Sequence, residues 1–310
     1  MLRGLKLYTD NLTAIVTVAD DGGGSGILRS ELNMPPPGDI RNCIEALANT
    51  EPTMEALLRY RFKSGTLKGQ NLGNLFLAAL NDMCSSFDEA VIKLSDVLAV
   101  TGRVLPVTNC NVILAALFDD GNEIVGESKI SEYKLSAGGN IRKVRLMPEN
   151  PPALKASTEA LAEAEMIILG PGSLYTSIIP NLLTKGVSET IAESDAVRVY
   201  VLNVMTQEGE TEGYTASDHI KALSDHAGVR LFDYCVADNS PFPDEIKKKY
   251  NSKGTDRTVT DEDKIKELGI ELITAPVADY SKGLARHNPK TLAKTLMELF
   301  TNKSPTKIYS

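Results

Sequence analysis

Short apolar runs alternate along the chain with longer segments of helical periodicity. The apolar runs are rich in Val and Ile, and they span 13–18, 112–118, 166–169, 197–204 and 232–236. The helical segments span 39–48, 71–83, 86–100, 153–164, 215–227 and 289–300. Because strands of a covered parallel sheet are apolar on both faces and are joined by helices, this alternation predicts βαβ units. We therefore expect an α/β fold with a mainly parallel sheet.

The region 111–148 departs from this alternation. It contains NVILAALFDDGNEIVGESKI, a polar SAGGN turn and then IRKVRLMP. The dipeptide Asp120-Gly121 lies between two β-type runs, which is a hairpin signal. We predict an antiparallel hairpin insertion on the parallel sheet. Since no repeat, low-complexity segment or clear linker is visible, we expect one domain over residues 1–310.

Composition narrows the classes of function. The 310 residues carry a net charge of −8, which argues against a broad nucleic-acid surface or an anionic-membrane surface. No apolar run approaches the roughly 20 residues that span a bilayer, and MLRGLKLYTD is too polar for a signal peptide. The four cysteines are scattered without a CxxC pair, which is typical of free thiols in a reducing compartment. We therefore expect a cytoplasmic protein.

Two carboxylates and a glycine-rich stretch follow the first apolar run, in TAIVTVADDGGGSG. Glycines admit positive φ and let a ligand approach the backbone, and successive N–H groups before a helix form an anion-binding nest. We assign this phosphate-binding stretch to Gly22, Gly23, Gly24, Ser25 and Gly26. Asp20 and Asp21 precede it, where a Rossmann-like unit places a carboxylate against a ribose. The alternative is a flexible turn with two solvated acids.

A second turn, PPPGDIRN, follows closely. Its prolines stiffen the approach, Gly38 makes the turn, and Asp39 fits the N-cap of the next helix. Arg41 and Asn42 then lie in the first helical turn, where they face either a ligand or only solvent.

The apolar run 166–169 ends in another glycine-rich loop. Its residues are Gly170, Pro171, Gly172 and Ser173, and Thr176 follows. In a parallel sheet, a loop at the carboxyl end of a strand lies where ligands bind. Backbone N–H groups and hydroxyls here suit a phosphate, although a tight strand-to-helix turn has the same sequence.

Polar residues after the later strands supply further candidates. Asn203 has the donors and acceptors to read a base or a sugar, and Thr206 follows it. Arg286 precedes a helix, where a guanidinium can bind a pyrophosphate through two hydrogen bonds or can form a surface ion pair. Tyr250 is suited to stack on a base or to close a helix end. No nucleophilic triad stands out, so we assign no catalytic residue.

Taken together, several segments resemble the gluconeogenesis factor (YvcK-like) family, a branch of the 2-phospho-L-lactate transferase (CofD-like) superfamily. The segments are TAIVTVADDGGGSG, LNMPPPGDIRN, NLGNLFLAAL, GRVLPVT, ILGPGSLYTSIIPNLL, NVMTQEGETEGYTASDHI and LARHN. The resemblance implies a three-layer α/β/α Rossmann-like fold and a cytoplasmic bacterial protein. It implies binding of UDP sugars such as UDP-N-acetylglucosamine, with a role in cell shape and cell-wall integrity during gluconeogenic growth.

The resemblance also has a point of departure. Members of the family open with a strand and a GGGTG-type loop ahead of a helix ending in LLRGLK, whereas this sequence starts at MLRGLK. We therefore expect the first strand and the first glycine-rich loop to be missing, so that the sheet lacks one central strand.

Residues and resemblance together predict a UDP-sugar-binding regulatory protein. The glycine-rich stretches hold the diphosphate, while Asp20 and Asp21 hold ribose or Mg²⁺. The residues that complete the pocket are Asp39, Arg41, Asn42, Asn74, Asn203, Thr206, Tyr250 and Arg286. The alternatives are a Mg²⁺-dependent transferase of a phospho-group from a nucleotide-linked donor, and a protein-interaction scaffold. We further expect a homodimer, which is common for this size and class, and a cell-wall or morphogenesis protein as partner.

Overall fold

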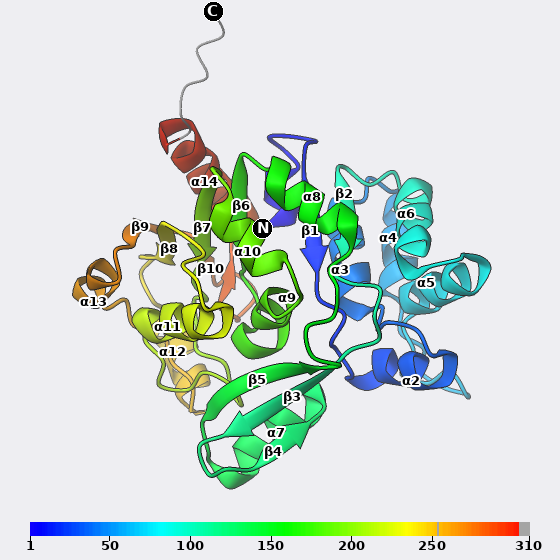
Figure 1. Ribbon diagram of the computed structural model, residues 1–310, viewed down its shortest axis with the longest axis horizontal. Helices are drawn as coiled ribbons and strands as arrows, with labels where there is room; N and C mark the ends of the chain where they lie inside the picture. Colours follow the sequence, from blue (N-terminus) through cyan, green and yellow to red (C-terminus); the bar gives the residue numbers. More distant parts are fainter. Residues whose placement is uncertain (253, 304–310) are drawn as a thin grey trace, which may run out of the picture.

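Parallel strands carry the fold, and they lie in two sheets (Figure 1). The computed structural model describes residues 1–252 and 254–303. The strands of the smaller sheet are β1 (Thr13–Val16) and β2 (Arg103–Pro106), and those of the larger sheet, in spatial order, are β6 (Met166–Leu169), β7 (Val197–Val201), β8 (Tyr234–Asp238) and β9 (Glu271–Ala275). The predicted mainly parallel α/β fold is confirmed. The expectation of a missing central strand stays a prediction.

Helices connect and cover these strands. They are α1 (Leu2–Leu5), α2 (Gly23–Leu32), α3 (Gly38–Leu47), α4 (Pro52–Arg59), α5 (Leu72–Met83), α6 (Phe87–Val97), α7 (Glu127–Ala137), α8 (Lys155–Glu163), the π-helix η1 (Leu174–Ile178), α9 (Ile179–Leu182), α10 (Val187–Glu193), α11 (Ala216–Ala227), α12 (Asp244–Asn251), α13 (Glu262–Glu267) and α14 (Pro289–Lys303). The predicted helical segments correspond to α3, α5, α6, α8, α11 and α14, with boundaries that differ by a few residues.

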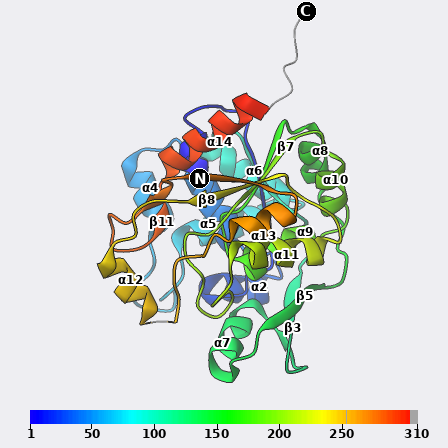
Figure 2. The same cartoon turned by 90° about the vertical axis from the view of Figure 1, so that its left-hand side faces the viewer.

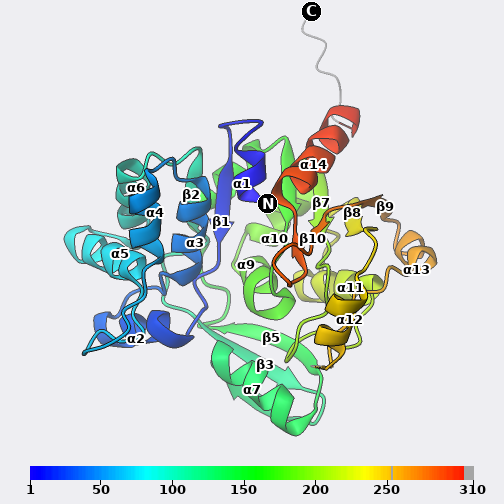
Figure 3. The same ribbon diagram turned by 180° about the vertical axis from the view of Figure 1, so that it is seen from behind.

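Strand β7 shows why the apolar runs are continuous. Val199 packs in one apolar cluster with Leu292 and Leu296 of α14, which crosses the back of the sheet beside α1 (Figure 3). Tyr200 packs in the other cluster, which contains Leu223 of α11. Since neighbouring residues of a strand point to opposite faces, both faces of this sheet need apolar side chains. The result is the predicted three-layer α/β/α arrangement.

The predicted antiparallel insertion is present, and it projects from the lower edge of the molecule in Figures 1 and 2. Its sheet has the order β4 (Glu123–Val125), β3 (Ile113–Phe118) and β5 (Ile141–Met147). The β3–β4 hairpin turns at Asp120-Gly121, where Gly121 has a φ of +89°. Helix α7, which the sequence pattern did not predict, packs against β3 and β4. The insertion therefore brings the start of α7 towards the loops that follow the parallel strands.

One further strand pair completes the fold. It is a short antiparallel pair that precedes α14 and consists of β10 (Ala278–Asp279) and β11 (Arg286–His287). Within residues 1–252 and 254–303, no helix combines the length and the apolar character that crossing a membrane requires.

Candidate functional site

The predicted glycine-rich phosphate loop is mostly helical. Gly22 is the N-cap of α2, with a φ of −77° and a ψ of 143°, and Gly23 already opens the helix with a φ of +49°. A Cβ on Gly26 would overlap the carbonyl oxygen of Asp21, so the chain can enter the helix this tightly only with glycine there. The stretch is therefore a helix N-terminus rather than an open loop, and α2 has no side-chain cap among the described residues.

The two aspartates before α2 serve different neighbours. Asp20 Oδ1 accepts a hydrogen bond of 2.8 Å from the backbone N–H of Gly22. Asp21 Oδ1 accepts one of 2.8 Å from the N–H of Ser128, at the start of α7. Asp20 thus fixes the entry to α2, and Asp21 connects this entry to the antiparallel insertion.

Three helix N-termini converge beside Asp20. A Cβ on Gly38, the first residue of α3, would lie 2.6 Å from Ser25 Oγ and 2.8 Å from Asp20 Oδ2. Asn74, in the first turn of α5, donates a hydrogen bond of 3.4 Å from Nδ2 to Ser25 Oγ. A Cβ on Gly24 would lie 2.9 Å from Gln70 Oε1, so α2 also approaches the start of α5 closely. The helix that the sequence predicts after PPPG therefore begins beside Ser25 and Asp20.

The start of α3 differs in detail from the prediction. Pro37 occupies the N-cap position, and Asp39 lies in the first turn, so Asp39 is not the N-cap. Burial raises the pKa of Asp39, the nearby charge of Asp20 raises it further, and the Asn42 side chain opposes the shift. Asn42 itself is exposed.

Arg41 is occupied by internal contacts. Its Nε donates a hydrogen bond of 3.2 Å to Asn74 Oδ1, and its Nη1 pairs with Glu45 Oε2 at 3.0 Å. Glu45 also pairs with Arg3 and Arg59. Arg41 therefore orients Asn74 beside Ser25, which is a positioning role for this site.

The second glycine-rich loop follows β6, as predicted, and it is held by the segment after β7. Gly170 has a φ of +79°, and Pro171 follows it through a cis peptide bond. Asn203 Nδ2 donates to the carbonyl oxygen of Gly172 at 2.8 Å, and Ser173 Oγ donates to Gln207 Oε1 at 2.8 Å. Asn203 thus contacts the predicted phosphate loop directly.

Glu210 anchors the segment that follows this second loop through hydrogen bonds. Only 1% of Glu210 is exposed, and burial raises the pKa of its carboxyl. Its Oε1 accepts from Thr176 Oγ1 at 2.9 Å, and its Oε2 accepts from the N–H of Tyr175 at 3.1 Å. Lys134 of α7 donates to the Glu210 carbonyl oxygen at 2.6 Å, and this lysine pairs with Glu212 at 2.9 Å. The sequence analysis missed this anchor.

Glu127, at the start of α7, lies close enough to the other acids of the site for their charges to act on it. Burial raises its pKa to about 7, and the charges of Asp20, Asp21, Glu210 and Asp39 raise it in that order. A Cβ on Gly22 would lie 3.9 Å from Glu127 Oε2, which places this carboxyl beside the start of α2. We call Asp20, Asp21, Asp39, Glu127 and Glu210 the acidic cluster.

The acidic cluster contains Asp20 and Asp21, the two predicted ligands of Mg²⁺. Among the described residues, no group of three or more His, Cys, Asp or Glu side chains is arranged to hold a metal ion. Since Mg²⁺ commonly uses only one or two carboxylates together with substrate phosphates, Asp20 and Asp21 as its ligands stay a prediction.

Thr206 and Tyr250 make internal contacts. The Thr206 N–H donates to the Asp256 carbonyl oxygen at 2.8 Å, and its Oγ1 accepts from the Asp256 N–H at 3.0 Å. Tyr250 Oη accepts from the N–H of Ala285 at 3.1 Å. Thr206 therefore holds the loop that follows β7, and Tyr250 holds the segment that precedes β11.

Arg286 lies exposed on β11, near the end of β7. The neighbouring His287 donates from Nε2 to the carbonyl oxygen of Leu202 at 3.1 Å. A further acid that the sequence analysis missed, Asp238 at the end of β8, pairs with Arg257 at 2.8 Å and accepts from the N–H of Ala278 at 2.8 Å. Its contacts fix the backbone around β10.

Replacing Glu127 with glutamine is expected to stabilise the protein above neutral pH. In the unfolded chain this carboxyl titrates near 4.5, and in the folded protein near 7, so the folded state binds the extra proton between these values. Stability is therefore lost as the pH rises from 4.5 to 7. Glu127→Gln removes this loss, which at pH 8 is about 3 kcal/mol for a fully buried carboxyl and about 2 kcal/mol after screening by the solvent that reaches this half-buried one, and it leaves stability near pH 4.5 unchanged.

Urea denaturation at pH 5 and pH 8 measures this effect. The matched control is Glu132→Gln, which changes an exposed residue of the same helix and should leave both values unchanged. Equal stabilities of Glu127→Gln and the unchanged protein at pH 8 would show that Glu127 is solvated rather than part of the acidic cluster.

Comparison with known proteins places this geometry in a family. Residues 1–278 match the family described as 2-phospho-L-lactate transferase CofD. The gluconeogenesis factor of Bacillus subtilis is 45% identical over 300 residues, which cover 96% of this chain and 93% of that protein. That of Halalkalibacterium halodurans is 44% identical over 299 residues, which cover 96% of this chain and 92% of that protein.

A solved structure shows the same fold. The crystal structure of a Bacillus halodurans protein is 44% identical and covers 96% of this chain and 94% of its own, with a TM-score of 0.92. The fold of this chain agrees with that of this structure over nearly its whole length. The chain therefore belongs to the gluconeogenesis factor family, within the CofD-like superfamily.

Proposed function

We propose that the protein binds a UDP sugar, with UDP-N-acetylglucosamine as the first candidate. One observation carries the proposal: the N-termini of α2 and α3 meet at Ser25 and Gly38, and neither has a side-chain cap within the described residues. Helix N-termini present unpaired N–H groups and partial positive charge, so an anion stabilises a place where two of them meet. A diphosphate is such an anion.

The remaining predicted residues support the proposal from two places. Asn74 and Arg41 hold Ser25 from α5 and α3. Gly172 and Ser173 follow β6 and are held by Asn203 and Gln207, and Arg286 lies on β11 beside His287, which bonds the Leu202 carbonyl oxygen after β7. Loops after the strands of a parallel sheet are where α/β proteins bind nucleotides.

The biological part of the proposal rests on the relatives. Since they are named gluconeogenesis factors, we infer that this protein acts in the cytoplasm of a bacterium that grows on gluconeogenic carbon sources. There it supports cell shape and cell-wall integrity by reporting the supply of the UDP sugar. A homodimer and a cell-wall or morphogenesis protein as partner belong to this proposal.

The acidic cluster favours one second candidate. Its five carboxyl groups repel a bare diphosphate, and a divalent cation removes that repulsion. Asp20 and Asp21 would hold Mg²⁺, which neutralises charge on transferring phosphates. The second candidate is accordingly a Mg²⁺-dependent transferase of a phospho-group from a nucleotide-linked donor, in line with the description of the matched family.

Calorimetry with parallel product analysis separates the two. The regulator should bind UDP-N-acetylglucosamine more tightly with Mg²⁺ than with EDTA, and it should release no product over hours. Turnover of this ligand, or of a guanylyl-linked donor, would establish the transferase instead. Binding of neither ligand would contradict both functions and favour a protein-interaction scaffold.

A further inference from the structure

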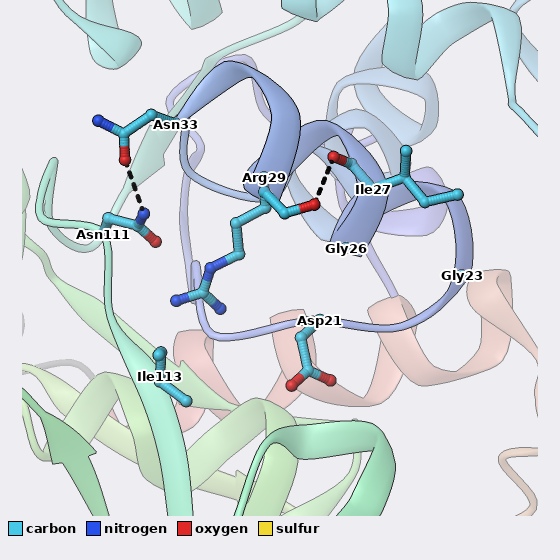
Figure 4. A pocket seen from close by; sticks show the side chains of 9 residues that line it. Asp21, Gly23, Gly26, Ile27, Arg29, Asn33, Asn111 and Ile113 are labelled. Atoms are coloured by element: carbon cyan, nitrogen blue, oxygen red, sulfur yellow. Dashed lines mark hydrogen bonds between the residues drawn. The ribbon is translucent and has the colours of Figure 1, made fainter.

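A pocket of about 540 Å³ lies between α2 and the start of β3, where Figure 4 views it. Asp21, Gly23 and Gly26 form its border with the first turn of α2, the place proposed for the diphosphate. Arg29 and Asn111 line the other side. Its volume falls within the range of small-molecule sites, about 300–1,000 Å³.

Arg29 is the unusual residue of this pocket. Only 8% of it is exposed, and its Nη2 donates to the carbonyl oxygen of Val112. Its buried Nη1 has no hydrogen-bond partner among the described residues. An unpaired buried donor on a charged group is costly, so nearly all such groups in proteins are paired. In Figure 4 the guanidinium points between Asp21 and Ile113.

The charges of the pocket select the kind of ligand. Arg29 and Asp21 carry opposite charges and attract each other. Asp20 and Glu127 lie close by, so a second strongly anionic group is disfavoured. A neutral group that accepts from Arg29 and donates to Asp21 satisfies both side chains, and a hydroxyl does both.

The rest of the lining favours a sugar ring. Asn33 and Asn111 present amides that donate and accept, and they are hydrogen-bonded to each other at 3.4 Å. Ile27 and Ile113 add partly exposed apolar surface, which suits the C–H faces of a pyranose. Planar polar groups beside aliphatic side chains match a ring that carries several hydroxyls.

We propose that this pocket takes the sugar ring of the nucleotide sugar, an inference that rests on the proposed function. The diphosphate at the start of α2 then lies between the sugar pocket on one side and the loops after β6 and β7 on the other. The structure thus assigns Arg29, Asp21 and Asn111 to the recognition of the sugar hydroxyls.

A blocking variant tests this assignment. Ser30 is exposed and lines the pocket, and its hydroxyl bonds only within α2, to the carbonyl oxygen of Ile27. Ser30→Trp should fill the pocket without disturbing the core. Glu31→Trp adds the same ring at the next, exposed position of the helix, which does not line the pocket, and is the matched control.

Calorimetry with UDP-N-acetylglucosamine and with UDP gives the readout. The unchanged protein and Glu31→Trp should bind the sugar nucleotide at least tenfold more tightly than UDP. Ser30→Trp should lose that preference and retain its affinity for UDP. Asn111→Ala, a truncation on the opposite wall, should reduce the preference severalfold, and it keeps the test valid if the tryptophan variant fails to fold.

Each other outcome is decisive. If Ser30→Trp keeps the full preference for the sugar nucleotide, the sugar binds outside this pocket. The same conclusion follows if the unchanged protein binds both ligands equally well. In either case Arg29 bonds water and not the sugar. If the variant loses affinity for UDP and for the sugar nucleotide equally, the pocket holds the nucleotide and the assignment is wrong. If neither ligand binds the unchanged protein, the proposed function itself fails, and this inference fails with it.

Discussion

Gly38→Ala is expected to lower the affinity for UDP-N-acetylglucosamine more than 100-fold, about 3 kcal/mol of binding free energy. The new Cβ would lie 2.6 Å from Ser25 Oγ and 2.8 Å from Asp20 Oδ2, so these two side chains must turn away or α3 must shift. Either change disturbs the place where the two N-termini meet, on which the proposed anion site depends. Overpacking costs about 1–3 kcal/mol, and the better helix propensity of alanine offsets up to about 1 kcal/mol, so folding should survive.

Calorimetry and urea denaturation together measure the two effects. Gly139→Ala is the control: it adds a Cβ in the turn before β5, where the nearest atom, at 3.0 Å, belongs to the exposed Asp119 side chain. Its affinity should stay unchanged. Adding Ser25→Gly to Gly38→Ala removes the nearest clash and should restore part of the binding. Full affinity of Gly38→Ala alone would show that the ligand does not bind where α2 and α3 meet.

The sequence predicted the parallel fold because burial on both faces leaves a local signature. The run 197–204 is mostly apolar, since Val199 and Tyr200 must fill opposite layers, and its polar residues are Arg198 and Asn203. Helix α7 left no such signature, because it has little amphipathic character: its buried positions are Ile130 and Lys134, and Lys134 is polar. Its placement depends on contacts with β3 and with Glu210, and Glu210 lies 76 residues from Lys134 along the chain.

The same contrast between local patterns and distant contacts separates the predicted residues of the candidate site from those that were missed. Asp20, Gly38 and Gly172 were predictable, because glycines and acids after strands are visible within a few residues. Glu127 and Glu210 were missed, since their roles come from an insertion and a loop that fold back from far along the chain. For Glu210 the local signal was the acidic run QEGETEG soon after a strand, which resembles a solvated loop. Thr206 and Tyr250 show the converse, because residues typical of ligand contact also fasten loops.

Arg286→Ala is expected to abolish nucleotide-sugar binding while the protein stays folded. Arg286 is exposed on β11 and has no side-chain partner in the described part of the chain, so its truncation should change stability by no more than about 0.5 kcal/mol. A guanidinium that binds a diphosphate through two charge-assisted hydrogen bonds contributes about 3 kcal/mol or more, which is a loss of at least about 100-fold. Calorimetry and thermal unfolding of the same sample measure both quantities.

The matched control is Arg142→Ala, which removes an exposed arginine from β5 of the antiparallel insertion and should leave the affinity unchanged. Arg286→Lys should recover only part of the binding, because an ammonium keeps the charge and loses the fork geometry. Affinity retained in Arg286→Ala would remove this residue from the site.

The protonation state of the neighbouring His287 allows the pH and salt dependence of binding to be assigned to Arg286. Burial lowers the pKa of His287 to about 4, so the ring is neutral near pH 7 and bonds the Leu202 carbonyl oxygen. Of these two side chains, only Arg286 then carries a positive charge at the end of β7. Its contribution should therefore weaken with added salt and stay constant between pH 6 and pH 8. A difference between Arg286→Ala and the unchanged protein that varies with pH over this range would count against Arg286, because its guanidinium stays charged throughout. Glu127, whose pKa is about 7, changes the binding of both proteins alike.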